Sequence, residues 1–212
     1  IDRTAIGKFL SKFEYPLHFL DFETISTAIP FFDNSRPYQN MPFQFSLRIH
    51  DRKGEMDHVE FLGDAVNDPR PQIVELLCRY IGPKGSVVAY NASFESGRLQ
   101  ELAALFPKRR KPLKSMVSRM RDLIIPFRSR HFIHPNFKGS ASLKAVLPVL
   151  VPDMSYENLE IAQGSAASQA YLDLASGRLP AEQTQPVCEN LIRYCGQDTL
   201  AMVRIFVSLR RM

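Results

Sequence analysis

The spacing of apolar residues changes along the chain from a strand-like to a helical period. Residues 17–22 are mostly apolar and predict a buried strand. Apolar and polar residues alternate over 43–50, which predicts a strand with one face in water. Residues 56–62 follow a turn at 51–54, so we expect this strand and the previous one to form an antiparallel hairpin.

Helical spacing begins at residues 68–71, which open a helix with Ile73, Leu76, Leu77 and Tyr80 on one face. The remaining pattern predicts strands at 86–90 and 123–125 and helices at about 93–106, 142–150, 165–174 and 182–210. This order predicts the α/β class: a mixed sheet, with an antiparallel meander plus parallel strands, flanked by helices. No repeat or linker divides the chain, so we interpret residues 1–212 as one domain.

The composition limits the class of protein and the cellular compartment that we expect. The 212 residues are 45% hydrophobic, enough for a substantial core, and no apolar run reaches the ~18 residues of a membrane span. The sequence begins at Ile1 without an initiator Met, so we expect a fragment of a longer protein whose other domains are candidate partners. Cys78, Cys188 and Cys195 lack metal-ligand spacing, and as free thiols they favour a reducing, cytoplasmic compartment.

Positive charge is concentrated in one segment. Residues 108–130 contain nine Lys and Arg residues and one acid, Asp122, whereas the whole chain carries a net charge of +5. Such a block indicates either a polyanionic partner or a solvated loop, and charge alone does not separate the two. Five ring side chains in this region could stack on bases or form the apolar underside of the loop: Phe127, His131, Phe132, His134 and Phe137.

The first candidate site lies on the first predicted strand. Asp21 and Glu23 are two residues apart, so their side chains point to one face while Leu20 and Phe22 point to the other, into the core. Two like charges on one strand repel each other unless a cation lies between them. The pattern Asp-x-Glu also occurs by chance, so it does not establish a metal site alone.

Two more candidates lie further along the chain. Glu95 is in the first turn of the helix after strand 86–90, where the helix dipole favours a carboxylate in any case, and Asn91 is a candidate cap. Tyr194 and Asp198 are four residues apart on the last helix and share one face, although an exposed acid and a half-buried tyrosine would also fit. Four acids gathered by the fold would suit Mg²⁺ or Mn²⁺.

The order and context of these motifs resemble the three exonuclease motifs of the DEDD family. Asp-x-Glu lies on the first core strand, an acid lies at a strand-to-helix junction, and Tyr-x-x-x-Asp lies on the last helix, as in the tyrosine (DEDDy) branch. The likeness covers roughly residues 16–207. It implies a ribonuclease H-like fold and a metal-dependent 3′–5′ exonuclease that uses two ions.

Four segments also resemble the bacterial family DUF2779, which is regarded as exonuclease-like: 90–95, 122–124, 142–148 and 194–202. In that family the domain tends to lie on the C-terminal side of longer proteins. The sequence departs from most DEDD enzymes at Glu95, where Asp is usual, and the extra methylene moves the carboxylate by ~1.5 Å. Three consequences are open: a second ion held through water, a preference for Mn²⁺, or a weakened site. Asp122 is the nearby substitute, although a capping or structural role is favoured for it.

The resemblance implies a role for each motif residue. Asp21, Glu23 and Asp198 would bind one Mg²⁺ or Mn²⁺ ion, and Asp21 would share a second ion with Glu95. Tyr194 would orient the attacking water, because a phenol with a reference pKa of about 10 is a poor base at neutral pH. Single-stranded DNA or RNA would cross the basic region and contact eight residues: Thr24, Asn91, Phe94, Arg109, Arg110, Lys111, Arg128 and Arg130.

Two other functions are compatible with the sequence. One is a non-catalytic nucleic-acid-binding ribonuclease H-like module whose metal site is degraded at Glu95. The other is a scaffold for a catalytic partner elsewhere in the full-length chain. The presence of Asp21, Glu23, Tyr194 and Asp198 favours the exonuclease. No residue distinguishes DNA from RNA, because that choice depends on contacts to the 2′-hydroxyl.

Overall fold

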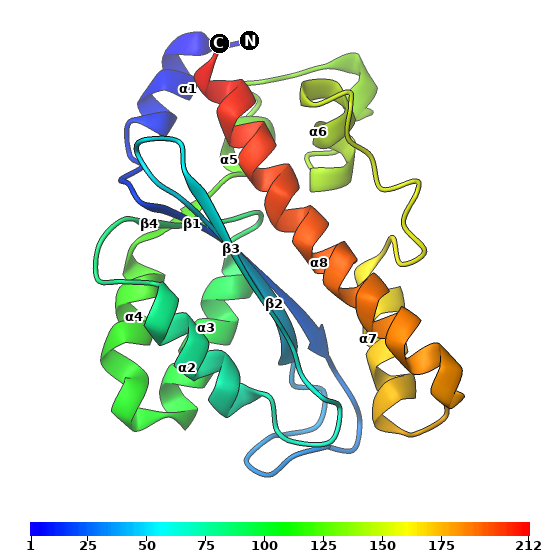
Figure 1. Ribbon diagram of the computed structural model, residues 1–212. Coiled ribbons are helices and arrows are strands. Elements are labelled where there is room, and N and C mark those ends of the chain that lie inside the picture. The colour runs from blue at the N-terminus through cyan, green and yellow to red at the C-terminus, as the bar shows by residue number, and fades with distance from the viewer.

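The computed structural model describes residues 1–212 and is built around one five-stranded sheet (Figure 1). The spatial order of the strands is β3-β2-β1-β4-β5. β1 pairs antiparallel with β2, and β2 with β3, whereas β1–β4 and β4–β5 are parallel pairs. The mixed sheet predicted from the sequence is therefore confirmed. The strands are β1 (Leu17–Ile25), β2 (Met41–His50), β3 (Met56–Leu62), β4 (Ser86–Ala89) and β5 (Met120–Asp122).

Helices cover both faces of this sheet (Figure 1). On one face lie α2 (Arg70–Tyr80), α3 (Ser93–Leu105) and α4 (Arg110–Ser118), which follows the short 3₁₀ helix η1 (Pro107–Arg109). The opposite face is covered by α7 (Gly164–Ala175) and by the 30-residue α8 (Ala181–Arg210). The remaining helices pack at one end, near the termini: α1 (Arg3–Leu10), α5 (Ile125–Arg128), η2 (Pro135–Phe137) and α6 (Leu143–Leu150). None of the helices is long and apolar enough to cross a membrane.

Each face of the sheet packs against its own apolar cluster. Leu20 and Phe22 of β1 belong to the cluster under α2, α3 and α4, whereas Phe19 belongs to the cluster under α8. Because side chains alternate along a strand, Asp21 and Glu23 face α8. The alternation within β1 therefore directs its two carboxylates towards the last helix.

A β-bulge changes the alternation in β2. Glu23 is paired with Gln44 but Thr24 with Pro42, so Phe43 is an extra residue in β2. Phe43 thereby turns to the α7 side and stacks on Tyr171, with ring centroids 3.9 Å apart. The expectation that one face of β2 would lie in water is wrong, because α8 covers the polar positions and buries Gln44 and Ser46.

Three smaller expectations also need correction. The last strand is β5 at 120–122; residues 123–124 instead form a turn, and Ile125 begins α5. The reason is local: the carboxylate of Asp122 accepts a hydrogen bond from the backbone N–H of Ile124 at 3.1 Å, which closes a turn directly after the strand. On α2, Tyr80 is exposed, and Val74 takes the buried position beside Ile73 and Leu77. The predicted cap of α3 is also wrong and is described with the site.

Candidate functional site

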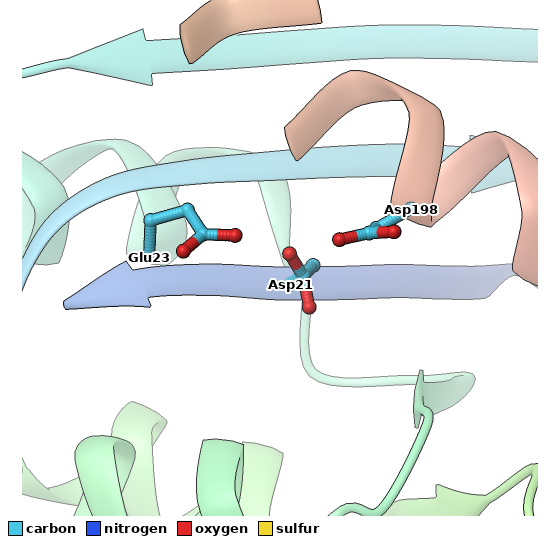
Figure 2. A group of neighbouring side chains, drawn as sticks. All are labelled: Asp21, Glu23 and Asp198. Atoms are coloured by element: carbon cyan, nitrogen blue, oxygen red, sulfur yellow. The ribbon is translucent and has the colours of Figure 1, made fainter. Parts of the chain in front are cut away.

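Three carboxylates from opposite ends of the chain meet between β1 and α8. Asp21, Glu23 and Asp198 each place one carboxylate oxygen so that all three oxygens lie within 4.8 Å of one another. Figure 2 shows Asp21 and Glu23 on the same strand and Asp198 on the helix beside it, with the three carboxylates gathered between these elements. Glu23 and Asp198 are buried, and Asp21 is half-buried. Oxygen ligands gathered in this way suit a hard divalent cation such as Mg²⁺ or Mn²⁺.

Buried polar contacts hold α8 against the sheet beside these acids. The Ser46 and Thr199 hydroxyl oxygens are 2.7 Å apart, and Thr199 donates to the carbonyl of Gly196 at 3.2 Å. The side-chain amide of Gln44 donates to the carbonyl of Leu191 at 2.8 Å. These bonds join β2 to α8 on both sides of Tyr194 and Asp198, so they fix the height of Asp198 above β1.

His58 of β3 extends this polar contact. Its Nε2 lies 2.8 Å from the Ser46 hydroxyl and 3.3 Å from a carboxylate oxygen of Glu60. Burial, assisted by the charge of Arg48, lowers the pKa of His58 to about 4, so the ring is neutral at neutral pH. A neutral ring with its proton on Nε2 donates to Ser46, Ser46 then donates to Thr199, and every hydroxyl in the row has a partner.

The acids raise one another's pKa. Burial first, and then the charges of Asp198, Glu23 and Glu95, raise the pKa of Asp21 well above its usual range. Burial and the charge of Asp198 raise the pKa of Glu23 to about 8, and burial raises that of Asp198 to about 6. This repulsion is a cost that a bound cation would remove, which is why clusters of this kind are candidates for functional sites.

Glu95 lies beside the three acids but outside their close group. It sits in the first turn of α3, as predicted, and is buried. Burial raises its pKa to about 8, and its charge contributes to the raised pKa values of Asp21 and Glu23. Its Oε2 atom is buried without a hydrogen-bond partner, which is unusual for a carboxylate oxygen. An unpartnered oxygen next to an acidic group is an appropriate ligand for a cation.

Tyr194 and Lys144 form the rim of the cluster. The ammonium of Lys144 donates to the phenol of Tyr194 at 3.4 Å and to the carbonyl of Ala162. It also lies over the rings of Tyr156 and Tyr194, 5.1 and 5.2 Å from their centroids. Its charge lowers the pKa values of Glu23 and Asp198, which offsets part of the repulsion within the cluster.

Tyr156 positions Asp198 directly. Its hydroxyl donates a hydrogen bond to Oδ1 of Asp198, so the other oxygen of that carboxylate is available to a ligand. Neither Tyr156 nor Lys144 was assigned a role from the sequence. Lys144 lies in the segment 142–148 that resembles DUF2779, which was a usable signal, whereas Tyr156 stands in a loop without periodicity. At the start of α7, Gly164 also approaches the site, because a Cβ there would lie 3.7 Å from Oε2 of Glu23.

The structure gives Asn91 and Asp122 structural contacts. Asn91 does not cap α3: its backbone is in the left-handed region at φ 67°, and its side-chain oxygen accepts a hydrogen bond from Arg128 at 2.8 Å. The residue before the helix is Ala92, which offers no side-chain cap. Asp122 accepts from the backbone N–H groups of Asn91 and Ile124, which agrees with the structural role favoured for it. The left-handed turn at Asn91 explains the failed prediction, since the side chain is turned away from the helix end.

Thr24 and Phe94 occupy positions near the acids. Thr24 follows Glu23 at the bulge, and its carbonyl accepts a hydrogen bond from Ser168 of α7 at 2.7 Å. Phe94 precedes Glu95 and is half-buried under the guanidinium of Arg98, 5.1 Å from its ring centroid. Both residues are close in sequence to a carboxylate of the cluster, and their roles in binding nucleic acid remain predictions.

The basic segment 108–130 is divided between two sides of the molecule. Arg109, Arg110 and Lys111 lie at the start of α4, on the sheet face opposite α8, and Arg109 is paired with Glu75 at 2.6 Å. Arg128 and Arg130 are exposed, and Arg128 lies at the turn at Asn91, to which it donates a hydrogen bond. A single nucleic-acid path across the entire segment is therefore not supported by this arrangement.

The three phenylalanines of this region face inwards, whereas His131 and His134 are half-buried. Phe127, Phe132 and Phe137 are only 5–6% exposed and pack against one another, with ring centroids 5.7–5.9 Å apart. Of the two roles open to them from the sequence, the apolar underside of the loop is the one observed. Stacking on bases would require these rings to leave the core.

This geometry defines a mixed α/β protein with an acidic cluster that could hold a metal ion. The chain belongs to the family described as "Domain of unknown function (DUF2779)", whose model matches residues 18–142. That range contains Asp21, Glu23 and Glu95 and ends before Lys144, Tyr194 and Asp198.

Curated relatives extend the similarity over nearly the whole chain. "Uncharacterized protein MG366" of Mycoplasma genitalium is 27% identical over 211 residues, which cover 91% of this chain and 32% of the relative. The Mycoplasma pneumoniae homologue of that protein is 26% identical, with the same shares. "Uncharacterized protein UU173" of Ureaplasma parvum is 24% identical and is covered to 31%. The chain thus spans about a third of the length of these relatives. No solved structure matches it significantly.

Proposed function

We propose that this chain is a metal-dependent 3′–5′ exonuclease domain of ribonuclease H-like fold that hydrolyses phosphodiester bonds of single-stranded nucleic acid. The observation that carries the proposal is the meeting of Asp21, Glu23 and Asp198 within 4.8 Å, at a point where only the ammonium of Lys144 offsets their charge. Burial of mutually repelling acids is costly, and a cation relieves that cost. Phosphoryl chemistry is a common use of such cation sites.

We expect the donor set to hold two hard cations. Asp21, Glu23 and Asp198 would hold one ion, and Asp21 with the unpartnered oxygen of Glu95 would hold the second. Bound ions of this kind lower the pKa of a coordinated water and neutralise charge on a phosphoryl group. All proposed ligands are oxygen atoms, which favours Mg²⁺ or Mn²⁺ over the metals that prefer Cys or His.

The chain's other residues at the cluster orient groups and supply positive charge. Burial and the charges of Asp198, Glu23 and Asp21 raise the pKa of Tyr194, so its phenol keeps its proton and acts as a hydrogen-bond donor to water or to a phosphate oxygen. Lys144 is exposed at the rim, where its ammonium can meet a phosphate that enters the acidic site. Tyr156 holds the Asp198 carboxylate in one orientation. Hydrolysis would add water across the terminal P–O3′ bond and release a 5′-mononucleotide.

One observation favours a second candidate, a nucleic-acid-binding module without catalysis. Glu95 lies outside the close group of three acids, so the position for a second ion is less complete than the first. A module with one ion, or with none, would retain binding and lose hydrolysis. This candidate and the exonuclease differ in turnover and not in fold.

The test is a time course with 5′-labelled single-stranded DNA and RNA in Mn²⁺, Mg²⁺ or EDTA. We expect a metal-dependent ladder that shortens from the 3′ end, absent in Asp198→Asn and present in Asp57→Asn, an exposed acid of β3 far from the cluster in sequence. The sugar that supports the ladder identifies the substrate. Binding without cleavage would favour the binding module, and equal turnover in Asp198→Asn would contradict the proposed site.

A further inference from the structure

Two neighbouring hollows on the surface share two of their lining residues. The first, of about 400 Å³, is lined by Tyr90, Asn91 and Leu143 among others, and the second, of about 440 Å³, by Arg130, Ile133 and His134. Arg128 and Ala141 line both, so the two hollows adjoin at these residues. We call this feature the Arg128 groove.

One end of the Arg128 groove is lined by residues that are close in sequence to residues of the proposed metal centre. Asn91, in its wall, is four residues before Glu95, and Leu143 directly precedes Lys144. Lys144 in turn contacts Tyr194 at the rim of the cluster. A chain lying in the groove would therefore have one end at the carboxylates and would extend outwards past Arg128 towards Arg130.

The walls of the groove are suited to a polyanion with apolar faces. No acidic residue lines either hollow, whereas Arg128 and Arg130 are exposed in them. Ile133 is 64% exposed and offers an apolar surface between the charges. Two hydrogen bonds connect lining residues of the groove: Arg128 donates to Asn91, and Tyr90 donates to the carbonyl of Ala141 at 2.7 Å. Because these bonds lie within the protein and need no ligand, the groove is preformed.

We infer that the Arg128 groove binds the part of a single-stranded polynucleotide upstream of the terminus that enters the acidic cluster, with Arg128 and Arg130 on successive phosphates. This inference rests on the proposed function for the position of the 3′ end. The two halves of the basic segment then differ in role. Residues 128–130 contact the strand, whereas the basic residues at the start of α4, on the other face of the sheet, do not.

The matched variants are Arg128→Gln and Arg130→Gln, with Lys114→Gln as the control. Each removes one positive charge and keeps a polar side chain, and Lys114 is exposed on α4, on the opposite face of the sheet. Gln also avoids a confounding backbone change at Arg130, whose φ of 58° disfavours a β-branched replacement. Circular dichroism checks that all three variants are folded.

The measurement is fluorescence anisotropy of labelled single strands of 3 and 12 nucleotides, in EDTA, over a range of salt concentrations. For the 12-nucleotide strand we expect Arg128→Gln and Arg130→Gln each to weaken binding about 3- to 10-fold and to reduce the slope of log K against log salt by about 0.7. The 3-nucleotide strand should bind more weakly than the 12-nucleotide strand, because it offers fewer phosphates to the two arginines. Lys114→Gln should bind both strands as the unaltered protein does.

Each outcome separates this inference from the proposed function. Unchanged binding in both Arg variants, or an equal loss in Lys114→Gln, overturns the groove even if the protein degrades nucleic acid. The expected losses in a protein that never cleaves would support the groove and contradict the exonuclease. No binding of either strand by the unaltered protein overturns the groove, and cleavage is then judged by the time course alone.

Discussion

The hydroxyl oxygens of Ser46 and Thr199 lie 2.7 Å apart, and this contact joins the middle of the sheet to α8 one residue beyond Asp198. Thr199 is fully buried and Ser46 nearly so, so neither hydroxyl has water as an alternative partner. The contact therefore fixes the position of an acidic ligand on a helix relative to two acidic ligands on a strand. A protein that needed only a stable core at this position would be expected to use apolar residues there.

Thr199→Val tests this positioning role. Valine keeps the shape and removes the hydroxyl, which leaves the Ser46 hydroxyl without one of its partners and should lower the free energy of unfolding by roughly 1–3 kcal/mol. Because Asp198 is adjacent, we also expect Mn²⁺ affinity, measured by calorimetry, to fall about 10-fold. Thr199→Ser keeps the hydroxyl and should restore most of the affinity.

The control for that variant is Ile205→Val, which truncates a buried residue of the same helix at a cost of about 0.5–1.5 kcal/mol. It should destabilise the protein without weakening Mn²⁺ binding. If Thr199→Val and Ile205→Val reduced Mn²⁺ affinity equally, the hydroxyl contact would be a general contribution to stability and nothing more.

Asp21→Asn should stabilise the metal-free protein at alkaline pH. The folded-state pKa of Asp21 is raised by burial and by three neighbouring acids, so its contribution to stability is present below its unfolded-state pKa and is lost as the pH rises. The amide carries no charge, so the difference in unfolding free energy should grow from pH 5 to pH 9, to on the order of 1 kcal/mol or more. Urea unfolding in EDTA measures it, and an Asn variant that is less stable at pH 9 would refute the repulsion.

Divalent cations should bind more tightly as the pH rises. The pKa values of Glu23 and Glu95 are raised to about 8 and that of Asp198 to about 6, so at pH 6 a cation must displace protons from at least two of these acids. We expect the apparent Mn²⁺ affinity to be at least about 10-fold higher at pH 8 than at pH 6, and the thermal shift at fixed Mn²⁺ to increase accordingly. A thermal shift independent of pH would show that Mn²⁺ binds elsewhere.

Shortening Glu95 should lower the Mg²⁺-supported rate. Glu95 already lies outside the close group of acids, and Glu95→Asp withdraws its carboxylate by a further ~1.5 Å. Mg²⁺ tolerates little change in ligand geometry, so the rate with Mg²⁺ should fall more than the rate with Mn²⁺. Glu95→Gln, which keeps the length and removes the charge, serves as the comparison. A faster Mg²⁺ reaction in Glu95→Asp would instead identify Glu95 as a weakened ligand.

The sequence predicted most elements of the fold because their signals are local. The apolar run of β1, the alternation in β2 and the helical spacing of α8 each depend on neighbouring residues only. The bulge at Phe43 and the burial of Gln44 and Ser46 could not be predicted in this way. Both depend on contacts with α7 and α8, which are far from β2 in sequence. The start of α5 was missed because the apolar triplet 123–125 is typical of a short strand, and the turn at Asp122 that prevents a strand is not visible in the sequence.

The candidate site was only partly accessible from the sequence. Asp21, Glu23 and Asp198 stand in motifs with recognisable spacing, whereas Tyr156 contacts Asp198 from a segment without any period. The basic segment looked continuous in sequence, and only the position of α4 separates Arg109 from Arg128 in space. Residues that act through a long-range contact leave no local signal, so composition alone could not assign them.

The most direct test of the account is calorimetric titration of the metal-free protein with Mn²⁺ at pH 8, alongside Asp198→Asn and the exposed-acid control Asp57→Asn. If Asp21, Glu23 and Asp198 form a metal centre, the unaltered protein and Asp57→Asn should each bind at least one Mn²⁺ ion. Asp198→Asn should raise the Kd for Mn²⁺ by about 10- to 100-fold. Equal affinities in all three proteins, or no Mn²⁺ binding by the unaltered one, would contradict the metal centre on which the proposed function depends.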